Sequence, residues 1–145
     1  MGLDMYLTAR QSTYDGFRNQ ELYNKLVQEA PFALQTATLE VQVGYWRKAN
    51  QIHSWFVKHV QGGVDDCEEY RVTRDQLQLL LDNCKLVLMH KEEAKTLLPT
   101  QEGFFFGSYE YDEYYWHDIQ DTIDQLEKVL TEYPETWDFK YQSSW

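Results

Sequence analysis

The sequence is poor in cysteine and has no long apolar segment. Its two cysteines, Cys67 and Cys84, follow neither a metal-binding nor a redox spacing. The opening residues, MGLDMYLTAR, lack the basic stretch and apolar core of a signal peptide, and the apolar runs are far shorter than a membrane-spanning helix. Position 6 is Tyr rather than Ser or Thr, so Gly2 does not meet the myristoylation pattern. We therefore expect a soluble protein of a reducing cytoplasm, with no membrane partner.

Basic residues are scarce as well. The chain has 13 Lys and Arg against 24 Asp and Glu, a net charge of −11, and residues 101–145 contain only two bases, Lys128 and Lys140, against 11 acids. Because binding to nucleic-acid phosphates needs clustered Lys and Arg, no direct DNA binding is expected. The acidic surface fits two alternatives, solubility at high copy number or mimicry of an acidic partner.

Known catalytic and metal-binding patterns are absent. The sequence contains no GxSxG, P-loop, GxGxxG or HExxH pattern. The four histidines, at positions 53, 59, 90 and 117, show no metal-ligand spacing, so we assign no metal site and no cofactor. The carboxylates at 112, 113 and 118, and the pair at 65 and 66, have the residue type needed for acid–base catalysis, but sequence does not place them in a cleft. A binding protein is therefore expected rather than an enzyme.

What the chain has in abundance is aromatic residues: five Trp, eleven Tyr and seven Phe make up 16% of 145 residues. Tyr and Trp combine an apolar body with a polar tip, so they suit ligand pockets and protein interfaces as well as cores. A domain of this size is not expected to bury all of them.

The spacing of apolar residues predicts a single α+β domain, residues 1–145, with helices packed on a short and mostly antiparallel sheet. In the second strand, Leu39, Val41, Val43 and Tyr45 are expected on one face. Gly44 is expected where the backbone bends or is closely approached. Residues 11–35 form an excursion between the first two strands, and the terminal strands are expected to pair. The predicted strands are 3–10, 36–45, a short piece around 70–72, and 137–142; the predicted helices are 19–30, 49–60, 73–88 and the last two-thirds of 103–130; residues 11–18 and 90–103 are predicted loops.

The first candidate site is the strand-to-helix junction Tyr45-Trp46-Arg47-Lys48. It places aromatic faces beside two cations, near a helix N-terminus whose free N–H groups favour anions. Arg can bind a phosphate through two hydrogen bonds and stack on a base, while Lys supplies a point charge. The alternative is that Trp46 packs in the core and the cations pair with surface acids.

Two polar residues of the following helix, Asn50 and His53, are candidate ligand contacts. His53 falls on the apolar face of its helix. It either forms hydrogen bonds within the core or contacts a ligand and titrates near neutral pH.

The second candidate site is the aromatic segment Phe104-Phe105-Phe106, bracketed by glycines, with the polar and aromatic residues after it. Its members could form a wall on which a purine stacks, each base contributing about 1–3 kcal/mol. The same residues could instead anchor a protein contact or form a buried hydrophobic corner. The further candidates in this segment are Tyr109, Tyr111, Asp112 and Tyr115.

Four separated blocks of the sequence, MGLDMYL, GYWRKANQIHSWFV, LLPTQEGFFFGSYEYDEYYW and YQSSW, resemble a family of small proteins encoded mostly in bacteriophage and prophage genomes. The resemblance covers most of the chain except residues 11–35, and it supplies no catalytic residues. It implies an accessory phage protein in the host cytoplasm, and such proteins often counter a bacterial defence.

Three hypotheses follow. The first is a protein that sequesters a small anionic nucleotide messenger. The second is an acidic inhibitor, in which the 101–145 region docks on a basic surface of a defence effector or nuclease. The third is an enzyme that degrades a nucleotide.

Overall fold

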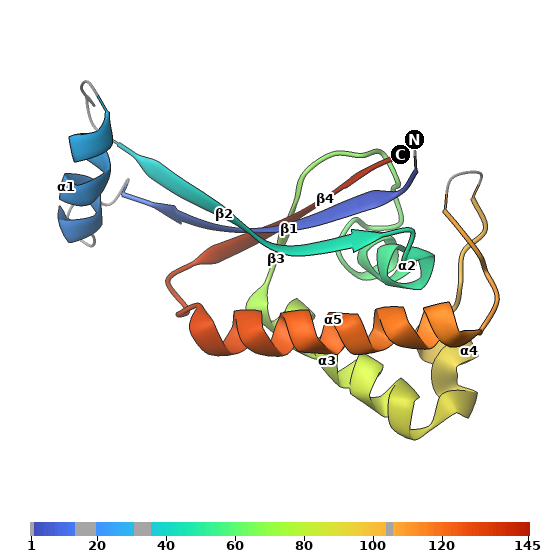
Figure 1. Cartoon of the computed structure of the whole chain (residues 1–145). Helices are drawn as coiled ribbons and strands as arrows, with labels where there is room; N and C mark the ends of the chain where they lie inside the picture. Colours follow the sequence, from blue (N-terminus) through green and yellow to red (C-terminus); the bar gives the residue numbers. More distant parts are fainter. Residues whose placement is uncertain (1, 14–19, 31–35, 104–105) are drawn as a thin grey trace.

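The computed structural model describes residues 2–13, 20–30, 36–103 and 106–145. These residues form an α+β domain, as predicted, in which helices pack against one face of a four-stranded antiparallel sheet of order β2-β1-β4-β3 (Figure 1). The elements are β1 (Asp4–Ser12), α1 (Gln20–Glu29), β2 (Thr38–Arg47), α2 (Asn50–His59), β3 (Tyr70–Val72), α3 (Arg74–Met89), the 3-10 turn η1 (Lys91–Glu93), α4 (Ala94–Leu97), α5 (Glu113–Glu132) and β4 (Asp138–Ser144).

The sheet is built around β1, which alternates in burial along its length as the sequence predicted. It pairs with β2 on one side and with β4 on the other, Asp4 lying opposite both Arg47 and Ser144. The expected pairing of the first and last strands is therefore confirmed, and the two chain ends lie side by side (Figure 1).

A β-bulge in β2 reverses the facing of its last residues. Leu7 pairs with Gly44 and Thr8 with Gln42, so Val43 is an extra residue. The prediction that Tyr45 shares a face with Val43 is wrong, because beyond the bulge Trp46 points into the core and Tyr45 is exposed. Gly44 is closely approached, as expected: a Cβ there would lie 3.0 Å from the Leu7 Cβ.

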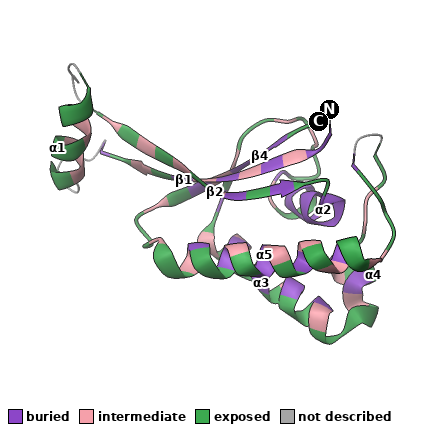
Figure 2. Cartoon of the chain, in the orientation of Figure 1, coloured by how far each residue is buried: buried purple, intermediate pink, exposed green. Residues whose placement is uncertain are grey.

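The chain passes from β2 into α2 through one residue in the left-handed region, Lys48, at φ 58°. The Lys48 N–H donates to the Leu3 carbonyl over 2.7 Å, which ties the junction to β1. The helix that follows is buried on almost every side (Figure 2). Its buried residues are Asn50, Gln51, Ile52, His53, Trp55, Phe56 and Val57.

Helices α3 and α5 pack together beneath the sheet and begin at side-chain caps (Figure 1). The predicted capping box of α3 is present: Thr73 Oγ1 accepts from Gln76 N–H, and Gln76 Oε1 accepts from Thr73 N–H. The first turn of α5 is capped by Asp112, whose carboxylate accepts from two backbone N–H groups. Both helices bury one apolar face, as their spacing predicted.

One segment differs from the prediction, and one helix lies away from the core. Residues 90–103 are not wholly irregular, because η1 and α4 occupy residues 91–97; these turns are too short to show a helical period in sequence. Helix α1, which was predicted, lies at the far end of the β1–β2 hairpin and has no buried residue (Figures 1 and 2). None of the helices in the described part of the chain is long and apolar enough to cross a membrane.

Candidate functional site

The predicted junction and the segment after the triple phenylalanine meet in space and enclose a cleft of about 340 Å³. Its walls come from the end of β2, the start of α2, the 107–112 loop and the first turns of α5. The lining residues are Arg47, Lys48, Gln51, Gly107, Ser108, Glu110, Asp112, Tyr114, Tyr115 and Asp118.

One wall of the cleft carries two cations. Arg47 and Lys48 are both exposed, and neither forms an ion pair with any residue that the structure describes. Lys48 is held by its backbone, and Gly107 packs so closely that a Cβ there would lie 3.0 Å from the Lys48 Cβ. The cationic groups are therefore available to a ligand, while the backbone beneath them is fixed.

The opposite wall carries the carboxylates of Glu110, Asp112 and Asp118. Burial raises the pKa of Asp118 to about 6, and a hydrogen bond from the Gln51 side chain partly opposes this. Gln51 is itself buried, and its Nε2 donates weakly to the Tyr115 carbonyl over 3.4 Å. The cleft therefore presents both signs of charge, with two cations facing three acids.

Aromatic surface in the cleft comes from α5. Tyr114 is 70% exposed and lines the cleft, so its ring can take a flat ligand. Tyr115, a predicted contact, is buried: its hydroxyl donates to the Leu98 carbonyl over 2.7 Å, and burial raises its pKa. Asp112, also predicted, lines the cleft, but its Oδ1 accepts from the backbone N–H groups of both tyrosines.

Asn50 holds the backbone next to the cleft in place. Its Nδ2 donates to the carbonyls of Phe106, at 3.0 Å, and Ser108, at 2.8 Å, while its Oδ1 accepts from the Gln101 N–H at 2.9 Å. These three bonds fasten residues 101, 106 and 108 onto the start of α2. The predicted ligand contact at position 50 thus has its side chain occupied within the fold.

His53 is fully buried and belongs to a polar network rather than to the cleft. Its Nε2 lies 3.0 Å from both carboxylate oxygens of Asp65, and its Nδ1 lies 2.6 Å from the Tyr141 hydroxyl. Because a carboxylate only accepts, Nε2–H donates to Asp65 and Nδ1 accepts from Tyr141. Burial lowers the pKa of His53, and Asp65 opposes the shift.

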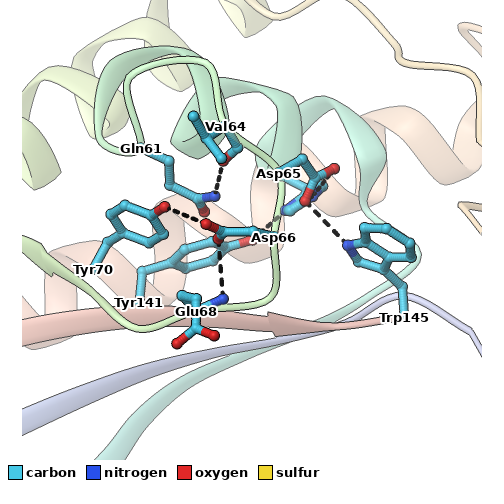
Figure 3. A network of polar contacts seen from close by, with 9 residues as sticks. Gln61, Val64, Asp65, Asp66, Glu68, Tyr70, Tyr141 and Trp145 are labelled. Atoms are coloured by element: carbon cyan, nitrogen blue, oxygen red, sulfur yellow. Dashed lines mark hydrogen bonds and ion pairs between the residues drawn. The ribbon is translucent and has the colours of Figure 1, made fainter.

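The same network reaches the last residue of the chain. The Trp145 indole N–H donates to Asp65 Oδ1 over 3.1 Å (Figure 3). The Trp145 ring also meets the Phe106 ring edge-on, with 6.1 Å between the ring centroids. Next to Asp65, Asp66 accepts from the Tyr70 hydroxyl (Figure 3). The network thereby joins α2, the 61–70 loop and β4.

The remaining predicted residues that the structure describes lie outside the cleft. Trp46 is only 2% exposed, and its indole N–H donates to Thr122 Oγ1, so it offers no face for stacking. Tyr45 lies on the outer face of the sheet, where its hydroxyl donates to Asp4 over 2.5 Å. The Tyr111 hydroxyl accepts from the Thr100 N–H, and Tyr109 is exposed beside it. Phe106 is buried against the His53 ring at 5.3 Å. Phe104 and Phe105 lie outside the described residues.

Sequence reasoning missed several of the lining residues, namely Gln51, Gly107, Ser108, Glu110, Tyr114 and Asp118. Asp118 was considered only as a possible acid–base residue. Its place in the cleft could have been suspected, because it lies one turn after Tyr114 on the same side of a helix that begins at the cleft. No feature of the sequence marks Gln51 as a lining residue of the cleft. Among the described residues, no three His, Cys, Asp or Glu side chains gather closely enough to hold a metal ion.

Comparison of the chain with protein-family models, with curated proteins and with solved structures finds no match.

Proposed function

We propose that this chain is a non-enzymatic binding protein that captures a small nucleotide-like molecule in the cleft between the β2–α2 junction and the start of α5. The observation that carries the proposal is the pair of cations, Arg47 and Lys48, that face the cleft without an ion-pair partner among the described residues. Two adjacent cations without an ion-pair partner suit a phosphate group.

The other wall matches the remainder of a nucleotide. Carboxylates such as Asp118 and Glu110 accept hydrogen bonds from ribose hydroxyls or from the amino groups of a base. The exposed ring of Tyr114 supplies a stacking surface in place of Trp46. Because three acids face two cations, the cleft favours a ligand with one phosphate over one with many.

The size of the cleft supports the same class of ligand. About 340 Å³ is at the lower end of the roughly 300–1,000 Å³ that ligand sites span. A binding protein of this kind acts by stoichiometric capture, so it requires affinity and abundance rather than turnover. The resemblance to phage proteins favours a nucleotide messenger of a bacterial defence as the captured molecule.

The experiment is a ligand screen by thermal shift and calorimetry, with nucleoside monophosphates and with cyclic and linear ADP-ribose-type and oligonucleotide signals. A ligand present at about 100 times its Kd stabilises the folded chain by about 2.7 kcal/mol, which is readily seen as a rise in Tm. Arg47→Ala and Lys48→Ala should each weaken binding, whereas Lys58→Ala, at an exposed position near the far end of α2, should not. An unchanged Tm across the panel would overturn the proposal.

An acidic protein-binding inhibitor is the second candidate, and the charges of residues 101–145 favour it. Of the 11 acids in this range, only Asp118, Glu127 and Asp138 form ion pairs within the described residues. Such an inhibitor would associate with its target more weakly at high salt and after neutralisation of Asp121 and Asp124. Arg47→Ala would leave it intact, which separates the two functions.

A further inference from the structure

Asp118 is a partly buried carboxylate on the cleft wall that receives few hydrogen bonds from the protein. Its side chain is only 28% exposed, and it forms no ion pair with a Lys or Arg in the part of the chain that the structure describes. His117 Nδ1 lies 4.0 Å from Asp118 Oδ1, but the His117 side chain is 81% exposed. The Gln51 side chain donates to the carboxylate. Because a carboxylate has about four acceptor sites, Asp118 has sites left for a ligand.

The Asp118 carboxyl is mostly ionised at neutral pH, although its burial opposes the charge. Its pKa is about 6, below the neutral range. An ionised carboxylate accepts hydrogen bonds and donates none. A ligand that brings two donors to Asp118 therefore offsets the cost of burying its charge, whereas a ligand that brings an acceptor adds repulsion.

Asp118 lies next to the aromatic surface of the cleft. It follows Tyr114 by one turn of α5, and both residues line the cleft. Side chains of an α-helix lean toward its N-terminus, so the Asp118 carboxylate extends over the turn that carries Tyr114. A base that stacks on the exposed Tyr114 ring therefore presents its edge to Asp118.

The two cations of the cleft do not neutralise this carboxylate. Arg47 and Lys48 line the same cleft as Asp118, but no ion pair forms across it between these described residues. A phosphate at the cations and a base edge at Asp118 therefore occupy different parts of the cleft, as the two ends of one nucleotide require.

We propose that the cleft selects guanine over adenine and that Asp118 determines this choice, an inference that rests on the proposed capture of a nucleotide in the same cleft. The Watson–Crick edge of guanine carries two adjacent donors, N1–H and the 2-amino group, which match the two oxygens of one carboxylate. Adenine carries one amino donor beside N1, an acceptor that would face a carboxylate oxygen. The ligand class is a guanine mononucleotide, with its phosphate at Arg47 and Lys48.

Calorimetry at neutral pH with monophosphates that differ only in the base tests the selection. The wild-type chain should bind GMP most tightly. IMP, which lacks the 2-amino group, should bind about tenfold more weakly, and AMP about a hundredfold more weakly than GMP, because each lost hydrogen bond to a charged group costs about a factor of ten. If AMP binds as tightly as GMP, the selection of guanine is wrong while nucleotide capture stands. If no nucleotide binds, the proposed function fails and this inference fails with it.

Asp118→Asn should change which base is preferred. An amide has one acceptor and one donor, which match the N1–H and the neighbouring carbonyl oxygen of xanthine, so the variant should bind XMP at least about tenfold more tightly than GMP. The variant loses a buried charge and keeps the shape of the side chain, so it is expected to fold, and its unfolding midpoint checks this. An Asp118→Asn chain that still prefers GMP overturns the proposal.

Two further variants separate the base edge from charge and from phosphate. Glu113→Gln makes the same change at an exposed position in the first turn of α5, outside the cleft lining, and should keep the wild-type order of affinities. Arg47→Ala should weaken GMP, IMP and AMP by similar factors, because the phosphate is common to all three. A changed order of affinities in either variant would overturn the assignment of the base edge to Asp118.

Discussion

The side chain of Gln125 hydrogen-bonds both polar groups of the Tyr45 backbone. The Tyr45 N–H donates to Gln125 Oε1 over 2.8 Å, and Gln125 Nε2 donates to the Tyr45 carbonyl over 2.9 Å. Because β2 is an edge strand, these backbone groups would otherwise lack a strand partner. A carboxamide from α5 thus takes the place of a neighbouring strand where β2 turns toward the cleft.

Replacing Gln125 should loosen this end of β2. Gln125→Ala removes both hydrogen bonds, and we expect a loss of about 1–2 kcal/mol in the free energy of unfolding. Gln125→Glu should cost more at neutral pH, because its carboxylate would face the Tyr45 carbonyl oxygen. Chemical denaturation measures both values. Gln120→Ala, which removes only an exposed bond to Asp124, is the matched control and should stay within about 0.5 kcal/mol of the wild type.

Asn50 is expected to be a structural residue of the cleft. Asn50→Ala leaves the carbonyls of Phe106 and Ser108 and the N–H of Gln101 without their partner, at a cost of about 3 kcal/mol. Hydrogen exchange at the Gln101 amide should accelerate in the same variant. Asn24→Ala, at an exposed position of α1, is the control. If Asn50→Ala matched the wild type in both measurements, Asn50 would not be what holds this backbone in place.

Gln125 and Asn50 form contacts that cannot be predicted from the sequence alone. The strands and helices follow from local patterns: the alternation of β1, the capping box of α3 and the apolar stripe of α5 are all visible in the sequence. The partners of Gln125 and Asn50 lie 80 and more than 50 residues away. No local pattern identifies such partners.

The bulge at Val43 explains the largest error at the site. Strict alternation predicts Tyr45 on the same face of the strand as Val43. The one extra residue of the bulge reverses which face each residue after Val43 occupies. Trp46 consequently enters the core, and the aromatic surface of the cleft comes from Tyr114 instead. In the sequence, Gly44 is the only residue that indicates an irregularity in this strand. Arg47 and Lys48 line the cleft because both lie at the end of the strand, where the chain turns.

Asp118 should make stability depend on pH in an unusual direction. Its pKa is raised from 3.8 to about 6 by burial, so between these values the folded chain binds a proton that the unfolded chain does not. Above pH 6 the buried charge is destabilising, and this effect disappears as the pH falls toward 4. Asp118→Asn should therefore stabilise the fold by about 1–2 kcal/mol near pH 7, a value that allows for partial exposure of the side chain, and by little near pH 4. Denaturation of both proteins across this range would show a constant difference if the prediction is wrong.

His53 should act in the opposite direction, and the Asp118→Asn background removes the opposing effect of Asp118. The pKa of His59 is also lowered by burial, so the NMR titration below is what assigns the effect to His53. The pKa of His53 is lowered from 6.5, chiefly by burial. Between its folded pKa and 6.5 the unfolded chain binds a proton that the folded chain does not, so stability falls as the pH is lowered through this window. The slope is limited to about 1.4 kcal/mol per pH unit for one group. An NMR titration of His53 in the folded protein should give a midpoint below 6.5, and a midpoint above that value would contradict the prediction.

Lys48 allows binding to be separated from folding. It adopts φ 58°, a region that glycine enters without cost and that β-branched residues strongly disfavour. Lys48→Gly should therefore leave the free energy of unfolding unchanged or raise it by up to about 1 kcal/mol, whereas Lys48→Val should lower it by more than about 1 kcal/mol. Both variants remove the ammonium group from the cleft.

A ligand that the cations hold should bind both Lys48 variants more weakly, and by similar factors, although their stabilities change in opposite directions. If binding followed stability instead, with Lys48→Gly retaining full affinity, the ammonium would have no part in the site. Calorimetry at a fixed ligand concentration, beside denaturation of the same samples, makes this comparison. Because the glycine variant is expected to fold at least as well as the wild type, a loss of binding in it points to the missing charge.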